Sequence, residues 1–212
     1  MNLLKNLDPK QREAAEQTKG PVLILAGAGS GKTRVLTYKI AYLTELGVRP
    51  ENIVAITFTN KAANEMKERV HKLVGEQLGK TMPYVGTFHS FCSKLLRIDG
   101  KHIGIAPNYL IYDSDDSLSL VKRIMNDEAI SPKNFKPSSI LNAISSAKNE
   151  LVSPSEYEQF AHGYFSETVT RVYAIYQKSL ASTDALDFDD LLMLSVRLLK
   201  EVPSVQDKWA GR

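Results

Sequence analysis

The sequence predicts an α/β fold in its first half, followed by a second half that is mostly helical. Short apolar runs of the kind found in buried strands alternate with helical periodicity up to residue 112. Short connections between such elements predict right-handed crossovers and a mostly parallel sheet. From residue 114 to residue 183 the periodicity is helical and no strand is evident. The shift in composition near residue 113 therefore predicts a domain boundary.

The first half is expected to contain strands and helices in strict alternation. Gly47 and Gly75 follow helical patterns at positions where a C-cap glycine belongs, and we expect each to end a helix. The expected strands cover residues 21–26, 53–58, 84–88 and 108–112, and the expected helices cover residues 9–17, 33–46, 62–74 and 90–97.

The second half is expected to be built from helices alone. Pro132, Pro137 and Pro154 stand at helix starts or connections, where proline is tolerated. The expected helices cover residues 115–127, 137–149, 153–161, 166–181 and 187–200.

Composition and charge narrow the class of protein. The 212 residues are 43% hydrophobic and 24% charged, which is ordinary for a globular chain. No apolar run approaches the roughly 20 residues that a membrane helix needs, and the N-terminus lacks a signal-peptide core, so we expect a soluble cytoplasmic protein without a membrane partner. The single cysteine, Cys92, excludes a disulfide framework and is interpreted as a small apolar helical residue. Residues 1–106 carry 16 basic and 9 acidic side chains, against 11 and 15 in residues 107–212, which suits a polyanionic partner for the first half.

A glycine-rich loop lies between the first expected strand and the helix that follows it. Glycines let successive backbone N–H groups turn inward around phosphate oxygens, and the helix N-terminus behind them favours negative charge. Lys32 is expected to reach the β- and γ-phosphates of a nucleotide, and the Thr33 hydroxyl to bind Mg²⁺. The predicted phosphate loop, in which Ala26 stands where the usual pattern has glycine, consists of Ala26, Gly27, Ala28, Gly29, Ser30, Gly31, Lys32 and Thr33.

Two places offer acidic residues that a nucleotide hydrolase needs for its metal and its attacking water. Asp113 ends an apolar strand pattern, and the segment 187–190 contains Asp187, Asp189 and Asp190. The same carboxylates are also well placed to cap the helices that follow them. Both interpretations stay open at this point.

The glycine-rich loop occurs in a fixed order with four further motifs. NLDPKQREA (6–14) precedes it, TFTNKAA (57–63) follows the second strand, VGTFHS (85–90) follows the third, and LDFDDL (186–191) comes late. This order resembles the amino-terminal region of bacterial superfamily 1 DNA helicases of the UvrD/Rep/PcrA group, and most of all its PcrA branch. The resemblance covers essentially the whole chain, and the family loop likewise begins with alanine.

The resemblance implies a RecA-like P-loop NTPase domain with a parallel sheet that carries a mostly helical inserted domain. Residues 1–113 would form the first part of the ATP-binding domain 1A, residues 114–185 the insertion 1B, and residues 186–212 the return to 1A. ATP and Mg²⁺ are the implied cofactors, and the implied activity is 3′-to-5′ movement along single-stranded DNA up to a single-strand/duplex junction. The family's Walker B carboxylates and arginine fingers have no counterpart in the sequence, so we expect this part to be inactive in hydrolysis by itself.

The resemblance also implies roles for single residues. Gln11 matches a glutamine that binds adenine, and Arg34 matches a residue near the adenine and ribose. Lys148 lies in a segment that the family places near the duplex, and it is expected to contact a phosphate. Phe58 and His89 are also of types that commonly pack in a core, so each has two interpretations. The residues expected to contact DNA are Phe58, Thr59, Asn60, Lys61, Thr87, His89, Lys148 and Phe188.

Two other functions remain open from the sequence. One is a P-loop ATPase or kinase without motor activity, and the other is a nucleotide- and DNA-binding module without motor activity. Repair, replication or transcription proteins are the expected protein partners, and a monomer is the expected state.

Overall fold

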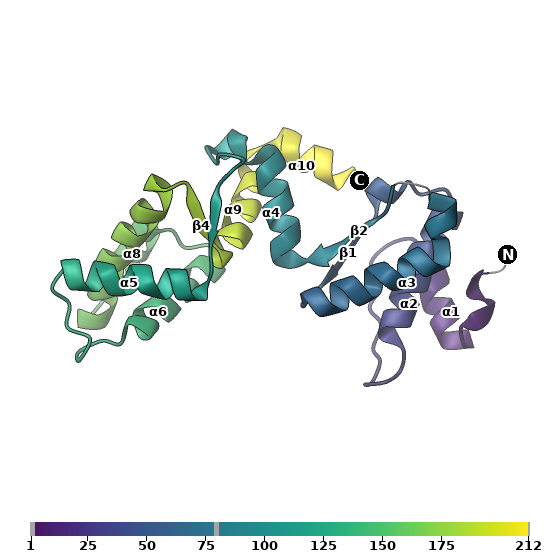
Figure 1. Cartoon of the computed structure of the whole chain (residues 1–212), viewed down its shortest axis with the longest axis horizontal. Helices are drawn as coiled ribbons and strands as arrows, with labels where there is room; N and C mark the ends of the chain where they lie inside the picture. The colour runs from purple at the N-terminus through teal and green to yellow at the C-terminus, as the bar shows by residue number, and fades with distance from the viewer. Residues whose placement is uncertain (1–2, 79–80, 212) are drawn as a thin grey trace. The chain divides into compact units, whose positions relative to one another are not determined.

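Helices account for most of the computed structural model, which describes residues 3–78 and 81–211 (Figure 1). The chain divides into two compact units. The first unit contains Met1–Phe91 with Lys208–Arg212, and the second contains Cys92–Asp207.

The first unit contains a pair of strands with helices before and between them. Its elements are the 3₁₀ turns Leu3–Asn6 and Pro50–Asn52, the helices α1 (Pro9–Glu16), α2 (Lys32–Glu45) and α3 (Asn60–Leu78), and the strands β1 (Val54–Thr57) and β2 (Tyr84–Thr87). The helices α4 (Phe88–Asp99) and α10 (Pro203–Ala210) each have residues in both units.

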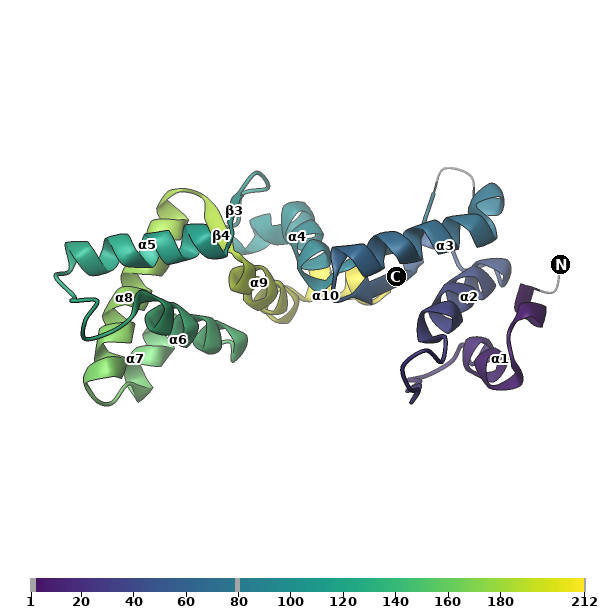
Figure 2. The same ribbon diagram turned by 60° about the horizontal axis from the view of Figure 1, so that its bottom comes forward.

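The second unit is a helical bundle with one short pair of strands. Figure 2 shows α5, α6, α7 and α8 gathered together. Its elements are the 3₁₀ turn Gly100–Ile103, the strands β3 (Leu110–Tyr112) and β4 (Ala185–Asp187), and the helices α5 (Ser114–Asp127), α6 (Pro137–Asn149), α7 (Pro154–Phe160), α8 (Tyr164–Ser182) and α9 (Phe188–Glu201).

Local sequence explains where these helices begin and end. The Asp8 carboxylate accepts a hydrogen bond from the Gln11 N–H, and Pro9 occupies the first helical position of α1. Gly47 ends α2 in the left-handed conformation, with φ +86°, as expected. Gly75 was expected to end the next helix, but α3 continues to Leu78. A single glycine costs a helix only about 1 kcal/mol relative to alanine, which neighbouring turns can offset.

The strands are parallel, as predicted, but they form two separate pairs instead of one sheet. β1 pairs with β2 in the register Val54↔Tyr84 to Thr57↔Thr87, and β3 pairs with β4. β4 was not predicted, because three residues are too short to give a periodic signal.

The expected buried strand at residues 21–26 is not formed. This segment is paired with no strand among the described residues, and the side chains of Leu23 and Leu25 are 83% and 87% exposed. Ile24 between them is partly buried against the small cluster that contains Ala15 of α1 and Val35 of α2.

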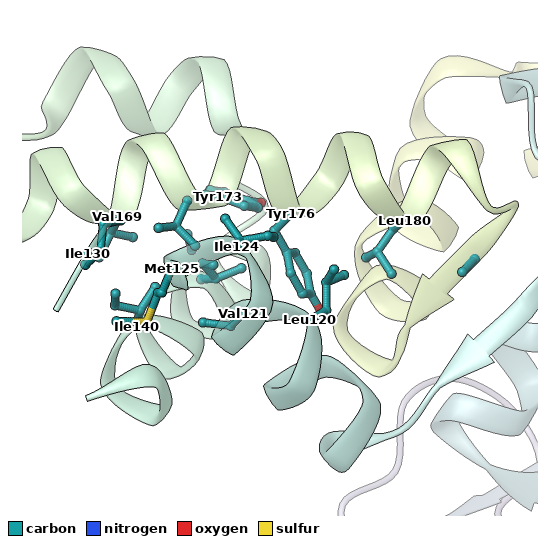
Figure 3. Close-up of a cluster of buried hydrophobic side chains, with 14 residues drawn as sticks. Leu120, Val121, Ile124, Met125, Ile130, Ile140, Val169, Tyr173, Tyr176 and Leu180 are labelled. Carbon is teal, nitrogen blue, oxygen red and sulfur yellow. The ribbon is translucent and has the colours of Figure 1, made fainter. Parts of the chain in front are cut away.

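Each unit has its own hydrophobic core. In the first unit, Ile40 of α2, Met66 and Val70 of α3 and Val85 of β2 belong to one buried cluster. In the second unit the core lies between α5, α6 and α8 (Figure 3). Among the described residues, no helix is long and apolar enough to cross a membrane.

The boundary between the units differs from the predicted one. It falls between Phe91 and Cys92, within α4, and not near residue 113. The physical reason is the pairing of β3 with β4, which ties residues 110–112 to the helical unit. The assignment of residues 1–113 and 186–212 to one RecA-like domain stays a prediction.

Candidate nucleotide and nucleic-acid interface

Two glycines of the glycine-rich loop adopt the left-handed backbone conformation. Gly29 and Gly31 have φ values of +76° and +81°, which residues with a side chain rarely adopt. A Cβ atom on Gly31 would also lie 2.8 Å from Nε2 of Gln11. The conformation therefore requires glycine at position 31, and a Cβ atom there would also displace the end of the Gln11 side chain.

Lys32 folds back over the loop. Its ammonium group donates hydrogen bonds to the carbonyl oxygens of Ala26 (2.8 Å) and Gly27 (2.6 Å). The Ser30 hydroxyl donates to the same Gly27 carbonyl at 2.8 Å. The loop thus holds its cation at its own centre, where a phosphate group would meet it.

Thr33 lies in the first turn of α2, directly after Lys32. Its side chain is partly buried, and its hydroxyl makes no hydrogen bond within the described part of the chain. The free N–H groups of this helix N-terminus, together with the helix dipole, favour an anion. The hydroxyl is an oxygen donor of the kind that Mg²⁺ accepts.

Gln11 connects α1 to the loop. Its Nε2 donates to the Ser30 carbonyl oxygen at 3.1 Å, while its Oε1 accepts from the Asp8 N–H at 3.4 Å. The structure therefore brings Gln11 to the phosphate loop and engages both ends of its amide, while the adenine contact implied by the resemblance stays a prediction. Arg34 instead donates to the Asn6 carbonyl oxygen at 2.6 Å.

The N-terminal segment is anchored on α2 by packing and by a lysine that the sequence did not single out. Lys39 donates to the carbonyl oxygens of Ala14 (3.2 Å) and Gln17 at the end of α1. Burial lowers the pKa of Lys39. Leu4, Leu7, Ala15 and Val35 form the small core beneath. This anchoring fixes the position of Gln11.

A second candidate surface lies where β1 and β2 end. Thr57 pairs with Thr87 in the parallel register, so the two motifs that follow these strands emerge at the same edge. α3 begins at Asn60 and α4 at Phe88, which places two helix N-termini at this edge. Such an edge favours phosphate groups.

Two aromatic side chains meet at this edge. Phe58 is 91% exposed, which excludes the core position that the sequence had left open. Its ring centroid lies 5.9 Å from that of Phe88, which is also exposed, and the two ring planes are tilted by 46°. The pairing of Phe58 with Phe88 was not predicted, since the sequence analysis placed the two residues at the ends of separate strands without assigning the strand order.

The polar residues of the two motifs divide into exposed ones and structural ones. The Thr59 hydroxyl accepts from the Ala62 N–H at 3.2 Å and caps α3. Thr87 is buried, and its hydroxyl accepts from the Ser90 N–H at 3.2 Å while the Ser90 hydroxyl accepts from the Thr87 N–H at 2.8 Å. Thr87 was expected to contact DNA, but it is buried and its hydroxyl shapes the start of α4. The exposed polar residues of the edge are Thr59, Asn60, Lys61, His89 and Ser90.

Gly86 allows β2 and α4 to approach closely. A Cβ atom there would lie 2.6 Å from both the Ser90 hydroxyl and the Tyr84 hydroxyl, which are 2.8 Å from each other. A side chain at this position would displace the hydroxyl groups of Ser90 and Tyr84 and so disturb the hydrogen bonds of Ser90 with Thr87 at the start of α4. The glycine of the motif thus has a packing role that the sequence did not reveal.

The expectation that Lys148 contacts a phosphate is wrong in this structure. Its side chain is completely buried in the helical unit and forms ion pairs with Asp187 (2.6 Å) and Asp190 (2.8 Å). Because its ammonium group lies inside the protein, it has no surface to offer to DNA. Phe188, between these two aspartates in the sequence, is exposed at the first position of α9.

The other acidic candidates act as helix caps. The Asp113 carboxylate accepts from the N–H groups of Asp115 and Asp116 at the start of α5, both at 2.9 Å. Asp187 caps α9 by accepting from the Asp190 N–H at 2.8 Å.

Cys92 is partly buried, and burial raises the pKa of its thiol. These observations favour the structural interpretation of all three groups.

The chain is similar to a known family and to several curated proteins. The family described as UvrD/REP helicase N-terminal domain matches residues 7–212. The ATP-dependent DNA helicase PcrA of Bacillus subtilis (strain 168) is 52% identical over 204 residues, which cover 96% of this chain and 27% of that protein. Proteins of the same name from Staphylococcus aureus (strain Mu50) and Staphylococcus epidermidis are 48% and 47% identical over 211 residues, or 99% of this chain and 29% of each relative. The chain therefore spans less than a third of the length of these relatives.

Proposed function

This chain belongs to the UvrD/REP helicase N-terminal domain family, and we propose on that premise that it binds ATP and single-stranded DNA as part of a superfamily 1 DNA helicase. The observation that carries the proposal is the presence, in one compact unit, of a phosphate loop at a helix N-terminus and an exposed aromatic pair at the carboxyl edge of two parallel strands. The loop accounts for nucleotide binding, and the edge accounts for binding of a single strand.

When ATP binds, side chains at the loop would exchange their present oxygen partners for those of the nucleotide. Lys32 would leave the carbonyl oxygens of Ala26 and Gly27 and donate to the β- and γ-phosphates. The Thr33 hydroxyl would hold Mg²⁺, which neutralises charge on the phosphate oxygens. Gln11 would turn its amide from Ser30 toward the adenine, and Arg34 would lie near the adenine and ribose.

Single-stranded DNA would lie along the edge after β1 and β2. Phe58 and Phe88 offer ring faces on which bases stack, a contact that tolerates any base. Lys61, Asn60, Thr59 and His89 would contact phosphates together with the starts of α3 and α4. Thr87 would act by capping α4. Phe188 of the helical unit would supply a further stacking surface.

In the whole protein we propose ATP-dependent translocation along the single strand in the 3′-to-5′ direction, with unwinding at a duplex junction. For this chain by itself we propose binding without hydrolysis. The carboxylates that could act on the metal or the water are engaged elsewhere. Asp113 and Asp187 cap helices, Asp190 pairs with Lys148, and Asp189 accepts a hydrogen bond from Asn149. Phosphoryl transfer depends on such groups being aimed at the phosphate.

Replacing Lys32 by alanine tests the nucleotide site. We expect Lys32→Ala to reduce the affinity for a fluorescent ATP analogue at least tenfold, because the loop loses its phosphate-directed cation, and a charged hydrogen bond contributes about 1.5–3 kcal/mol. Equilibrium titration measures this affinity. Lys19→Ala, which removes an exposed lysine from the same region, serves as the matched control and should bind like the unaltered chain. Equal affinities for all three proteins would mean that the loop is only structural.

A nucleotide- and DNA-binding module without motor activity is the second candidate. The engagement of Asp113, Asp187 and Asp190 as caps and ion-pair partners favours it for the chain taken alone. A phosphate-release assay with and without oligo-dT is expected to give background rates for the 212-residue chain. DNA-stimulated turnover of about 1 s⁻¹ or more, as in a slow kinase, would contradict this and assign a catalytic role to one of these aspartates.

A further inference from the structure

A cluster of buried charges lies in the helical unit, where α6, α8, β4 and α9 meet. Lys148 of α6 and Asp190 of α9 have side chains with no exposed surface, and the Asp187 side chain at the end of β4 is 7% exposed. The Lys148 ammonium group contacts Oδ2 of Asp187 at 2.6 Å and Oδ1 of Asp190 at 2.8 Å. One cation thus holds two carboxylates that are three residues apart.

The remaining oxygen atoms of these carboxylates are also occupied. Oδ1 of Asp187 accepts from the Asp190 N–H, and Oδ2 of Asp190 accepts from the Asp187 N–H, which makes a reciprocal cap at the start of α9. The Tyr176 hydroxyl donates to Oδ2 of Asp187 at 2.9 Å, and Gln177 Nε2 donates to Oδ1 of Asp190 at 3.1 Å. Figure 3 shows the Tyr176 ring within the core of the unit. Every contact restricts the backbone of residues 187–190.

This restricted backbone carries Phe188. Asp187 precedes Phe188 in an extended conformation, and Asp190 follows it within the first turn of α9. The two aspartates that Lys148 holds therefore lie on either side of Phe188 in the sequence. Asn149, the neighbour of Lys148, donates to Oδ1 of Asp189 at 3.2 Å. The end of α6 therefore contacts the aspartates on both sides of Phe188, while the Phe188 side chain stays exposed.

A general stabilising role is a poor explanation for buried charges at this place. Replacing a buried ion pair by apolar side chains of similar volume is often neutral or favourable for stability, because the charges lose their hydration. A buried charged cluster does, however, define one arrangement of its partners, since its hydrogen bonds have fixed directions. Here the cluster defines the backbone conformation at the start of α9, where Phe188 lies.

We propose that Lys148 is a positioning residue for single-stranded DNA binding. Through Asp187 and Asp190 it fixes the junction of β4 and α9 so that the Phe188 ring is presented for stacking on a base. The inference rests on the proposed function, because it needs Phe188 to contact DNA. Lys148 itself does not touch the DNA.

A double-mutant cycle on the 212-residue chain tests this proposal. The quantity measured is the ratio of affinities for oligo-dT and for an abasic oligonucleotide of equal length, which isolates base stacking from phosphate binding. We expect Phe188→Ala to lower this ratio at least about fivefold, the lower end of what one stacked base contributes. Lys148→Met should lower it similarly, and the double variant should be no worse than Phe188→Ala.

Two further variants make the result decisive. Lys178→Met removes an exposed lysine from α8 and should leave the ratio unchanged. Tyr176→Phe removes only one hydroxyl from the cluster, so it tests the same proposal if circular dichroism shows that Lys148→Met does not fold. It should lower the ratio by a smaller factor, and only when Phe188 is present.

The possible failures are distinguishable. If Phe188→Ala leaves the ratio unchanged, the DNA contact of Phe188 is wrong, and the proposed function fails at that residue. If Phe188→Ala lowers the ratio but folded Lys148→Met and Tyr176→Phe do not, the positioning role is overturned. A further loss on adding Lys148→Met to Phe188→Ala would also overturn it, since Lys148 would then act independently of Phe188.

Discussion

Asp190 shows how burial changes the chemistry of a single carboxylate. Its pKa is raised to about 6 because burial penalises the charged form, and the negative charge of Asp187 adds to this effect. The ion pair with Lys148 acts in the opposite direction but does not compensate, because one ammonium group is shared between two carboxylates. Asp190 therefore binds a proton more tightly in the folded chain than in the unfolded one.

This raised pKa predicts an unusual pH dependence of stability. Between about pH 4 and pH 6 the folded state holds more protons at this site than the unfolded state, so the contribution of Asp190 to the free energy of unfolding falls as the pH rises. Relative to Asp190→Asn, which cannot titrate, the unaltered chain should lose up to about 3 kcal/mol of stability over this range. Urea unfolding of both proteins at several pH values measures the difference. A constant difference between them would contradict the raised pKa.

Lys148 illustrates what the sequence could and could not disclose about the site. The family resemblance led to the expectation of a phosphate contact, and the general rule that an isolated lysine lies in solvent did not indicate a buried position either. The missed signal is its spacing, since Lys148 follows Ile140 and Ile144 at helical intervals on the buried face of α6. Its two carboxylate partners are about forty positions away in the sequence, and no local pattern connects them. By contrast, the glycine-rich loop was predictable because its chemistry lies in consecutive residues.

At the scale of elements, caps decide where the helices begin. Asp113 accepts two backbone N–H groups at the start of α5 and forms a reciprocal cap with Asp116. Asp113→Ala should lower the free energy of unfolding of the helical unit by about 1 kcal/mol, the usual effect of losing such a cap. Asp127→Ala, at the last residue of α5, is the matched control and should be neutral or slightly favourable because it removes a negative charge from the negative end of the helix dipole. Urea unfolding followed by circular dichroism distinguishes the two variants, and equal effects would contradict the capping role.

The elements were predictable to the extent that their signals are local. α6 has the predicted bounds, because Pro137 marks its start and apolar residues recur at helical spacing. The segment 21–26 has the composition of a strand, but a strand also needs a partner to pair with, and the described chain pairs β1 only with β2. β4 is the opposite case, since pairing with β3 makes a strand of three residues that carry no pattern of their own.

At the scale of the whole molecule, the two units contain different residues of the proposed binding sites. The first unit contains the phosphate loop and the aromatic pair of Phe58 and Phe88, and the helical unit holds Phe188 on a restricted backbone. We propose that the first unit binds nucleotide at the phosphate loop and single-stranded DNA at the edge after β1 and β2.

The most direct test is the fluorescence anisotropy of labelled oligo-dT over a series of salt concentrations. We predict that the logarithm of the association constant falls linearly with the logarithm of the salt concentration, with a slope of about −0.7 for each phosphate contacted. Phe58→Ala should weaken binding by about 1–3 kcal/mol through loss of stacking. Phe160→Ala, which removes a 75% exposed ring at the end of α7, should leave binding unchanged. Absence of binding at low salt, or equal binding by Phe58→Ala and the unaltered chain, would contradict the assignment of this edge to DNA.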